Sequence, residues 1–448
     1  MIHDRPLTAE ERAKSQYNYN WFNVINGASY MCLGESVIVL FAIRLNMSNT
    51  VISLIGAMLF LGYLLLPLGV KRAAKVGAAS CQADFWVCRN IAALLVALSI
   101  FVNFYSPLLA GITLLTGAFL FYGFRAAGIV LGSPMIGDIT TEDDRSAVIG
   151  RSTALFYGSG AFALACISTI LYFQDSVWIL VGIIVTGASL GVTASTFVRN
   201  IDETSALRKS AQRPLFGGLP YLINNPDGRN LAVVWFLTNL TNLLIIPISI
   251  LTLKRGCGVS DTNAVIFSLI QFVIMIFASQ YSPLLTKRLG PRMMILIACF
   301  CYVPTILFWI CLPSLGLTEG WLLWCLMVIP FGMQGIASVV NTNSLIHYFL
   351  MTVEKEHQVE CVMILNLITG AAAGIIGMGI AAGLMKLAEL IPGCEGLEVF
   401  RNYFIMILLL FCGELPLFFR LKTVIHEYRA KHGEEATEKA LERPHHKH

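Results

Sequence analysis

Long apolar runs, each bounded by charged residues or by proline and glycine, recur along most of the chain. Most are about as long as the roughly 20 residues that an α-helix needs to cross the hydrocarbon core of a bilayer. The pattern therefore predicts an all-α integral membrane protein with twelve membrane-spanning helices. The expected spans are 20–44, 50–70, 84–104, 108–131, 149–173, 177–199, 230–253, 262–285, 292–312, 320–344, 360–386 and 402–420.

The composition agrees with this pattern. Of the 448 residues, 56% are hydrophobic and 13% are charged, and the mean hydropathy is +0.71. Soluble domains carry about 25% charged residues, so the composition excludes an ordinary water-soluble enzyme. A span with its connection needs about 35 residues, and twelve of them use nearly the whole chain. We therefore expect no enzyme activity, no cofactor and no metal site.

The basic residues are distributed unevenly between the two sides of the predicted membrane. The side that holds both termini carries 24 of the 31 Lys and Arg residues, the opposite loops carry five, and Arg89 and Arg125 lie within spans. Because basic residues accumulate in cytoplasmic loops, both termini are expected to be cytoplasmic, in the inner membrane of a bacterial type of cell. The net charge of +4 is too small and too dispersed to indicate a nucleic-acid partner.

The longest internal polar stretch separates the spans into two groups of six. It predicts two helical bundles joined by a linker, in which PLFGGLPYLI is a candidate surface helix. The expected segments are a cytoplasmic N-terminal segment at 1–19, a six-helix bundle at 20–199, a cytoplasmic linker at 200–228, a second six-helix bundle at 229–420 and a cytoplasmic tail at 421–448.

An internal repeat supports the division into halves. Two sets of residues recur at an offset of 216 residues: Pro67, Lys71 and Arg72 match Pro283, Lys287 and Arg288, while Asn23 and Asn26 match Asn239 and Asn242. Two independent matches at one offset near half the chain length indicate a duplicated six-helix unit.

These features together resemble the major facilitator superfamily, over essentially the whole chain. The motifs that carry the resemblance are Gly62…Pro67…Lys71-Arg72…Gly77, its repeat Tyr281-Ser-Pro283…Lys287-Arg288…Gly290, the loop Asp138…Glu142-Asp-Asp-Arg145…Gly150-Arg151, and Asn225-Pro226-Asp-Gly-Arg229. The resemblance implies two pseudo-symmetric six-helix bundles and transport by alternating access. It also implies a gating role for Pro67, Lys71, Arg72, Asp138, Arg145, Pro283, Lys287 and Arg288.

The sequence departs from the family pattern at three places. The loop after span two lacks the acidic residue that the family usually carries there, so gating by a carboxylate of that loop is not expected. Span two contains no acid, which disfavours a sodium site. Span five lacks the proline of the antiporter signature, and the direction of transport stays open.

Two charged residues within spans are candidates for transport chemistry. A charge at the centre of a spanning helix costs at least ~2.5 kcal/mol, so it usually faces a cavity or a partner. Glu35 is a candidate proton-coupling carboxylate, or alternatively a helix cap or a contact between the bundles. Arg125 is a candidate cavity residue that could assist coupling or bind an anion, or alternatively a structural partner of loop carboxylates such as Asp138. The two lie at levels that differ by roughly 10 Å along the helices.

Amide and tyrosine side chains provide further candidates for solute binding. Asn23 and Asn26, like Asn239 and Asn242, are spaced i, i+3 and share a helix face. They could line a central cavity, or they could form hydrogen bonds between packed helices. The complete set of candidate substrate-binding residues is Asn23, Asn26, Tyr30, Tyr122, Arg125, Asn239, Asn242, Gln334 and Asn341.

The sequence thus predicts a monomeric secondary transporter that moves a small polar solute, with an anion favoured, across the bilayer with protons as the coupling ion. An exporter of amphipathic drugs or lipids is the alternative, and a membrane-embedded receptor or scaffold is more remote. Cys257 and Cys394 both fall in predicted outer loops and could form a disulfide.

Overall fold

The computed structural model describes residues 2–174, 176–259, 261–315 and 321–422. Within these residues, twelve helical segments are long and apolar enough to cross a membrane, which confirms the predicted number of spans. They are Ala9–Arg44, Leu54–Val76, Ala78–Asn103, Pro107–Ile139, Arg145–Phe173, Val177–Arg199, Pro226–Leu251, Leu269–Thr286, Arg288–Leu315, Trp321–Thr352, Lys355–Glu389 and Leu397–Phe418.

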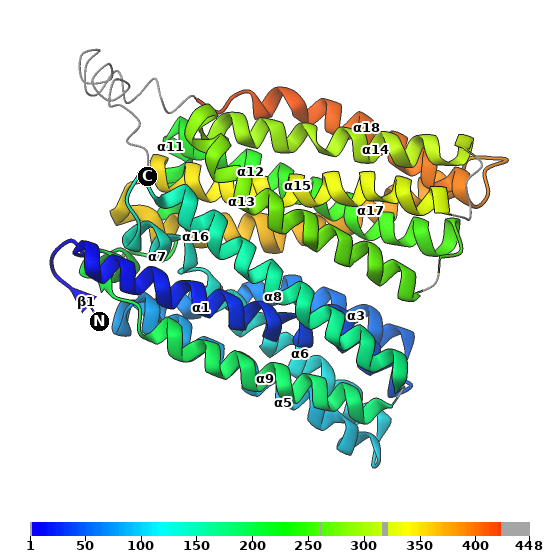
Figure 1. Cartoon of the computed structure of the whole chain (residues 1–448), viewed down its shortest axis with the longest axis horizontal. Helices are drawn as coiled ribbons and strands as arrows, with labels where there is room; N and C mark the ends of the chain where they lie inside the picture. The colour runs from blue at the N-terminus through cyan, green and yellow to red at the C-terminus, as the bar shows by residue number, and fades with distance from the viewer. Residues whose placement is uncertain (1, 175, 260, 316–320, 423–448) are drawn as a thin grey trace.

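The first six spans form the N-terminal half, which lies in the lower part of Figure 1. Several spans are interrupted, so a span can contain more than one helix. The elements of this half are α1 Ala9–Leu33, α2 Glu35–Arg44, α3 Asn49–Leu61, η1 Gly62–Leu65, α4 Leu66–Val76, α5 Ala78–Asn103, α6 Pro107–Ile129, α7 Gly132–Ile139, α8 Arg145–Phe173 and α9 Val177–Arg199.

The last six spans form the C-terminal half, in the upper part of Figure 1. Its elements are α12 Pro226–Leu251, η2 Thr252–Gly256, α13 Asp261–Phe300, α14 Tyr302–Cys311, η3 Leu312–Leu315, α15 Trp321–Thr352, η4 Lys355–His357, α16 Gln358–Asn366, η5 Leu367–Ala372, α17 Ala373–Glu389 and α18 Leu397–Phe418. The long α13 contains span eight and the first part of span nine, and it is interrupted at Gly290, where a φ of 77° takes the chain out of the helix.

The first helix begins earlier than the apolar pattern predicts. Thr8 and Glu11 form a capping box, in which the Thr8 hydroxyl accepts the Glu11 N–H at 3.3 Å and the Glu11 carboxylate accepts the Thr8 N–H at 2.8 Å. This reciprocal cap starts α1 at Ala9. Residues 9–19, expected to be a separate segment, are therefore a polar extension of the first span.

The linker between the halves is folded. It contains β2 Glu203–Thr204, α10 Ser205–Ala211 and α11 Gly218–Asn224, and β2 pairs in parallel with β1 Ile2–His3 at the N-terminus. The candidate surface helix corresponds to α11, which buries Leu222 and leaves Leu219 and Ile223 exposed. The tail beyond residue 422 lies outside the described residues.

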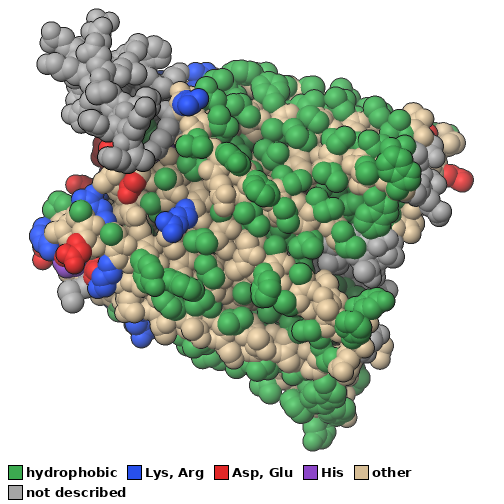
Figure 2. Space-filling view, in the orientation of Figure 1, with side chains coloured by type: hydrophobic (Ala, Val, Ile, Leu, Met, Phe, Trp, Pro, Cys, Tyr) green, Lys and Arg blue, Asp and Glu red, His purple; other side chains and the backbone are tan. Residues whose placement is uncertain are grey.

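Charged side chains gather at one end of both halves, beside the start of α1, while hydrophobic side chains cover much of the visible surface (Figure 2). We call the end that carries α7, α10, α11 and η4 the charged end. The two halves diverge in Figure 1 from this end toward the opposite end.

Glycines of span eleven lie directly against aromatic rings of span two, and this contact joins the two halves. A Cβ atom added at Gly374 would lie 1.8 Å from the Phe60 ring, and one added at Gly370 would lie 2.5 Å from the Tyr63 ring. Only glycine leaves room for these rings, so η5 and α17 can pack directly on α3 and η1.

Candidate functional site

A cavity of about 320 Å³ lies between the halves, and most of its wall comes from the N-terminal half. Helices α1, α5, α6, α7 and α8 supply residues from one side, and α15 supplies residues from the other. Its lining contains tyrosine, phenylalanine and tryptophan rings together with the polar residues Asn23, Asn26, Gln82, Arg125, Thr153 and Asn343.

Arg125 is the charged residue of this lining. Its guanidinium carbon lies 4.7 Å from the centre of the Tyr30 ring, a cation–π contact between α6 and α1. Tyr63, Tyr122 and Tyr157 are close enough to interact with its charge. Among the described side chains, no carboxylate pairs with Arg125 and none lines the cavity. The ring contact leaves the N–H groups of Arg125 available to an anionic ligand.

A second guanidinium lies directly behind the wall. The side chain of Arg89 on α5 is fully buried, between the rings of Trp86 at 4.9 Å and Phe121 at 5.4 Å. Arg89 donates to Asn26 Oδ1 at 3.2 Å and to Ser29 Oγ at 3.1 Å. Its partners are thus neutral, and its charge interacts with that of Arg125.

Arg89 is the residue that sequence reasoning passed over. The sequence places Arg89 inside a span, which is the same signal that makes Arg125 a candidate. Because a charge within a membrane span is costly, its position in a span is sufficient to make each arginine a candidate functional residue.

The four asparagines of the repeat lie in different environments. Asn23 and Asn26 line the cavity, and Asn26 Oδ1 also accepts the Trp86 indole N–H at 2.9 Å. Asn242 Oδ1 accepts the Tyr302 hydroxyl at 2.8 Å, and neither Asn239 nor Asn242 belongs to the lining.

The two asparagine contacts are related by the repeat. Trp86 and Tyr302 are 216 residues apart, the same offset that relates Asn26 to Asn242. Each half therefore joins its first and third spans by one equivalent hydrogen bond. For Asn242, the interpretation as a packing residue is the one that fits its contact.

The other predicted binding residues lie near the cavity or away from it. Tyr30 lines it beneath Arg125, whereas Tyr122, Gln334 and Asn341 are buried outside its lining. Tyr122 packs against Phe121, with ring centres 5.1 Å apart. The amides of Gln334 and Asn341 lie within α15.

Glu35 is the first residue of α2, directly after the extended backbone of Gly34 interrupts the first span. Its side chain lies outside the described part of the structure, so its predicted proton-coupling role remains a prediction. The proposed structural pair between Arg125 and Asp138 is wrong. Asp138 instead accepts the backbone N–H and the hydroxyl of Thr204, the latter at 2.8 Å.

The predicted gating residues lie at the charged end. Arg72 donates to Asp84 at 2.8 Å, and Arg199 contacts the same carboxylate at 2.5 Å. Asp84 on α5 thus supplies the acid that the preceding loop lacks. Pro67 lies in the first turn of α4, and Lys71 is exposed.

Several gating residues connect the two halves. Asp138 of α7 lies 3.9 Å from Lys355 of η4, and a Cβ added at Gly150 would lie 2.4 Å from Pro283. Thr153 donates to Asn343 at 3.1 Å beside the cavity.

Among the described residues, Arg145 and Arg288 form no hydrogen bond or ion pair across the halves. Arg145 is buried and lies 3.4 Å from the Thr140 hydroxyl. Arg288 is exposed, and the side chain of Lys287 lies outside the described residues.

A buried carboxylate from the linker closes the N-terminal half at this end. Glu203 accepts the backbone N–H groups of Ala78 at 2.8 Å and Ala79 at 3.3 Å, at the start of α5. The chain turns there at Gly77, which has a φ of 90°. Burial raises the pKa of the Glu203 carboxyl to about 7.

Two further predictions concern cysteines and metals. Cys257 and Cys394 are both free, so no disulfide joins them, and Cys394 Sγ lies 3.2 Å from the Asn402 amide nitrogen. Within the described residues, no group of three or more His, Cys, Asp and Glu side chains could hold a metal ion.

Comparison with known proteins identifies the family of the chain. The family model described as Major Facilitator Superfamily matches residues 22–388. No curated protein matches the chain. Solved structures resemble it at low sequence identity.

A bacterial homologue of the iron transporter ferroportin, in an outward-facing state, has a TM-score of 0.68 at 12% identity and covers 91% of this chain and 98% of its own. A proton:xylose symporter has a TM-score of 0.65 at 11% identity, over 92% of this chain and 96% of its own. A nucleoside transporter has a TM-score of 0.61 at 12% identity, over 89% and 99%. These similarities extend over nearly the whole fold, and their low identity limits them to the fold.

Proposed function

Because this chain belongs to the major facilitator superfamily, we propose that it moves a small organic anion across the membrane by alternating access. The observation that carries this proposal is the pair of guanidinium groups at the central cavity. Arg125 lines the cavity and Arg89 lies behind its wall. Neither has a carboxylate partner among the described residues.

The electrostatics of the cavity favour an anionic solute. Two unit charges interact far more strongly in a protein interior than in water, because the effective dielectric constant falls from about 80 to about 20. Two neighbouring arginines therefore make the potential in the cavity positive. A carboxylate or phosphate group entering it would offset their mutual repulsion and could accept charge-assisted hydrogen bonds from Arg125.

The size of the cavity favours a small solute. Pockets for drug-sized molecules range from about 300 to 1,000 Å³, and a volume of about 320 Å³ is at the lower end of that range. The amides of Asn23, Asn26 and Gln82 could bind hydroxyl or carbonyl groups of the same molecule.

An exporter of amphipathic molecules is the second candidate, and one observation favours it. A groove of about 780 Å³ with a largely apolar wall runs between α8 and α13, lined by residues such as Leu155, Phe162 and Ile276. An amphipathic molecule could reach the cavity from the lipid through this groove. Arg151 is the charged residue of the groove lining. In an exporter the groove would select the solute, whereas in an anion transporter the central cavity would select it.

A screen of the purified protein against small metabolites tests this proposal. Ligands that bind the folded state raise its unfolding temperature. Carboxylates and phosphate esters should stabilise the protein, and their neutral amides or alcohols should not. Stabilisation only by hydrophobic cations or by lipids would instead support the exporter.

We further propose that protons drive transport and that Glu35 is the coupling carboxylate. Its position in the interrupted first span supports this role, because an ionisable residue within a span marks a transport pathway in many transporters. Glu35→Gln should abolish uphill accumulation in proteoliposomes with an imposed pH gradient and should leave exchange of solute partly intact. Full uphill transport by this variant would exclude the coupling role.

The proposed orientation places the charged end in the cytoplasm of a cell with an inner membrane, with the protein acting as a monomer. The unequal distribution of basic residues supports this orientation. Reporter fusions after Lys209 and after Lys431 should both report cytoplasm. A periplasmic signal from either fusion would contradict the proposed orientation.

A further inference from the structure

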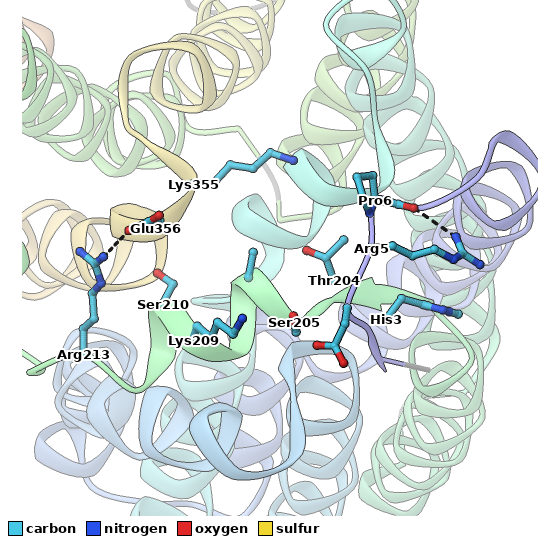
Figure 3. Close-up of a pocket in the computed structure, with 12 residues that line it drawn as sticks. His3, Arg5, Pro6, Thr204, Ser205, Lys209, Ser210, Arg213, Lys355 and Glu356 are labelled. Carbon is cyan, nitrogen blue, oxygen red and sulfur yellow. Dashed lines mark hydrogen bonds and ion pairs between the residues drawn. The ribbon is translucent and has the colours of Figure 1, made fainter.

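A second cavity, of about 550 Å³, lies at the charged end of the molecule. Three separate segments of the chain line it: residues 3–6 at the N-terminus, residues 204–213 of the linker, and Lys355 and Glu356 of η4 (Figure 3). It shares no lining residue with the central cavity. Its function is therefore separable from solute binding between the halves.

The lining of this cavity is basic. Four cationic side chains, Arg5, Lys209, Arg213 and Lys355, face two carboxylates, Asp4 and Glu356. The lining thus holds two more positive than negative side chains, with His3 taken as neutral. Carboxylates just outside the lining, those of Glu11, Glu360 and Asp138, lie within 4.0 Å of Arg5, Arg213 and Lys355.

The two arginines are already engaged. Arg5 forms a bidentate pair with Glu11, at 2.7 and 2.9 Å. Arg213 contacts Glu356 at 2.5 Å and the His357 ring at 2.8 Å.

The two lysines keep most of their hydrogen-bonding capacity. The Lys209 side chain makes no hydrogen bond or ion pair among the described residues, and Lys355 Nζ is 3.9 Å from Asp138 Oδ1, which is beyond hydrogen-bond distance. Figure 3 shows Lys209 projecting from α10 and Lys355 projecting from the opposite side of the cavity.

Hydroxyl groups complete the polar wall. Ser205 and Ser210 line the cavity beside Lys209. The Ser210 oxygen accepts the backbone N–H of Val359 at 3.3 Å, so its own proton remains available for donation. Two ammonium groups with neighbouring hydroxyls suit a compact, multiply charged oxyanion.

We propose that this cavity binds a phosphate group, carried by a soluble phosphorylated molecule or by an anionic lipid. The ligand would contact Lys209, Lys355 and the adjacent serine hydroxyls. The site lies where the linker meets both halves, because α10 packs against α4 of the N-terminal half and against η4 and α16 of the C-terminal half.

Pyrophosphate is a suitable soluble probe for this site. The full-length purified protein is titrated with pyrophosphate at constant ionic strength, by calorimetry and by thermal unfolding. A matched set of nanodiscs contains phosphatidylcholine with or without phosphatidic acid. Saturable binding of pyrophosphate identifies a soluble ligand, and stabilisation by phosphatidic acid alone identifies a lipid headgroup.

The double variant Lys209→Gln/Lys355→Gln should weaken whichever response is observed at least tenfold. Lys75→Gln is the matched control, because it removes an exposed positive charge at the same end without altering the lining of this cavity. The unfolding temperatures without added anion show whether each variant is folded. Arg125→Ala should retain the response, which separates this test from the proposed transport function.

Two results would overturn the proposal. One is the absence of a saturable response to both pyrophosphate and phosphatidic acid. The other is a response that survives in the folded double variant or that is weakened equally by Lys75→Gln, because either would indicate general attraction of anions to a basic surface.

Discussion

The two halves of the molecule share a packing contact but differ in the charge built around it. In the N-terminal half, Asn26 binds Trp86 and also the buried Arg89. In the C-terminal half, Asn242 binds Tyr302, and Thr305 occupies the position equivalent to Arg89 and donates to the carbonyl of Pro330 at 3.2 Å. The hydrogen bond between the first and third spans is thus accompanied by the guanidinium of Arg89 in the N-terminal half and by the hydroxyl of Thr305 in the C-terminal half.

This difference shows how a duplicated fold can carry an asymmetric site. The hydrogen bond between the first and third spans of each half serves packing, and both halves retain it. The cationic groups that favour an anion lie in the N-terminal half, where α1, α5 and α6 meet. Variants at equivalent positions of the two halves can therefore separate binding from packing.

The largest expected effect comes from Arg125→Ala. A hydrogen bond to a charged group contributes about 1.5–3 kcal/mol, so binding of the transported anion should weaken by roughly 10- to 150-fold. Asn239→Ala, in the first span of the C-terminal half, should leave affinity unchanged. Calorimetry on both purified variants checks this prediction. Equal losses would mean that both halves bind the solute.

The next effect compares the two asparagines. Asn26→Ala leaves the buried indole N–H of Trp86 without its acceptor and removes one of the acceptors of the buried Arg89, and an unpaired buried polar group costs about 1–3 kcal/mol. Asn242→Ala takes the acceptor from one buried donor, the Tyr302 hydroxyl, so it disturbs one donor where Asn26→Ala disturbs two. Reversible unfolding should therefore show a larger loss of stability for Asn26→Ala. The reverse order would contradict the assigned contacts.

A smaller effect on binding is expected from Arg89→Met. A unit charge roughly 10 Å from a bound anion contributes about 1.7 kcal/mol at an effective dielectric constant of ~20, so anion affinity should fall by roughly 15- to 20-fold. A neutral analogue should bind as before. Thr305→Val, at the equivalent position, should change neither affinity. If Arg89→Met weakens anion and neutral analogue equally, its role is structural and not electrostatic.

The last comparison concerns the turns that precede spans three and nine. At Gly77 the turn is closed by the buried Glu203, whereas Gly290 is followed directly by Pro291. The pKa of Glu203 is raised from 4.5 to about 7, so its contribution to stability is fully present below pH 4.5 and is lost as the pH rises through 7.

Unfolding temperatures between pH 4.5 and 8 measure this contribution. The wild-type protein should lose stability relative to Glu203→Gln across this interval. The substitution Pro291→Ala, at the other turn, should leave the pH dependence of the wild type intact. Parallel pH profiles for wild type and Glu203→Gln would show that Glu203 does not titrate in this range.

The fold could be predicted because its signal is local. The sequence shows twelve apolar runs directly. The apolar pattern predicts a later start for the first helix than the capping box at Thr8 and Glu11 gives it. The repeat also predicted that Asn26 and Asn242 are equivalent, and their contacts with Trp86 and Tyr302 agree with that equivalence.

The site was less predictable because it depends on which helix faces meet. Spacing along one helix cannot show that Arg125 lies over Tyr30, or that Asn26 shares its oxygen between two donors on α5. The symmetry of the asparagines favoured a cavity lined equally by both halves. Tertiary packing instead places Asn23 and Asn26 in the lining and leaves Asn239 and Asn242 outside it.

Discrimination between an anion and its neutral isostere tests the central claim most directly. The carboxylate that stabilises the purified protein best is offered to proteoliposomes as a radiolabelled solute, with its own primary amide as competitor. The wild-type protein should accumulate the carboxylate and resist competition by the amide, and Arg125→Gln should lose this preference. Equal competition by the amide in the wild type would contradict a site selective for anions.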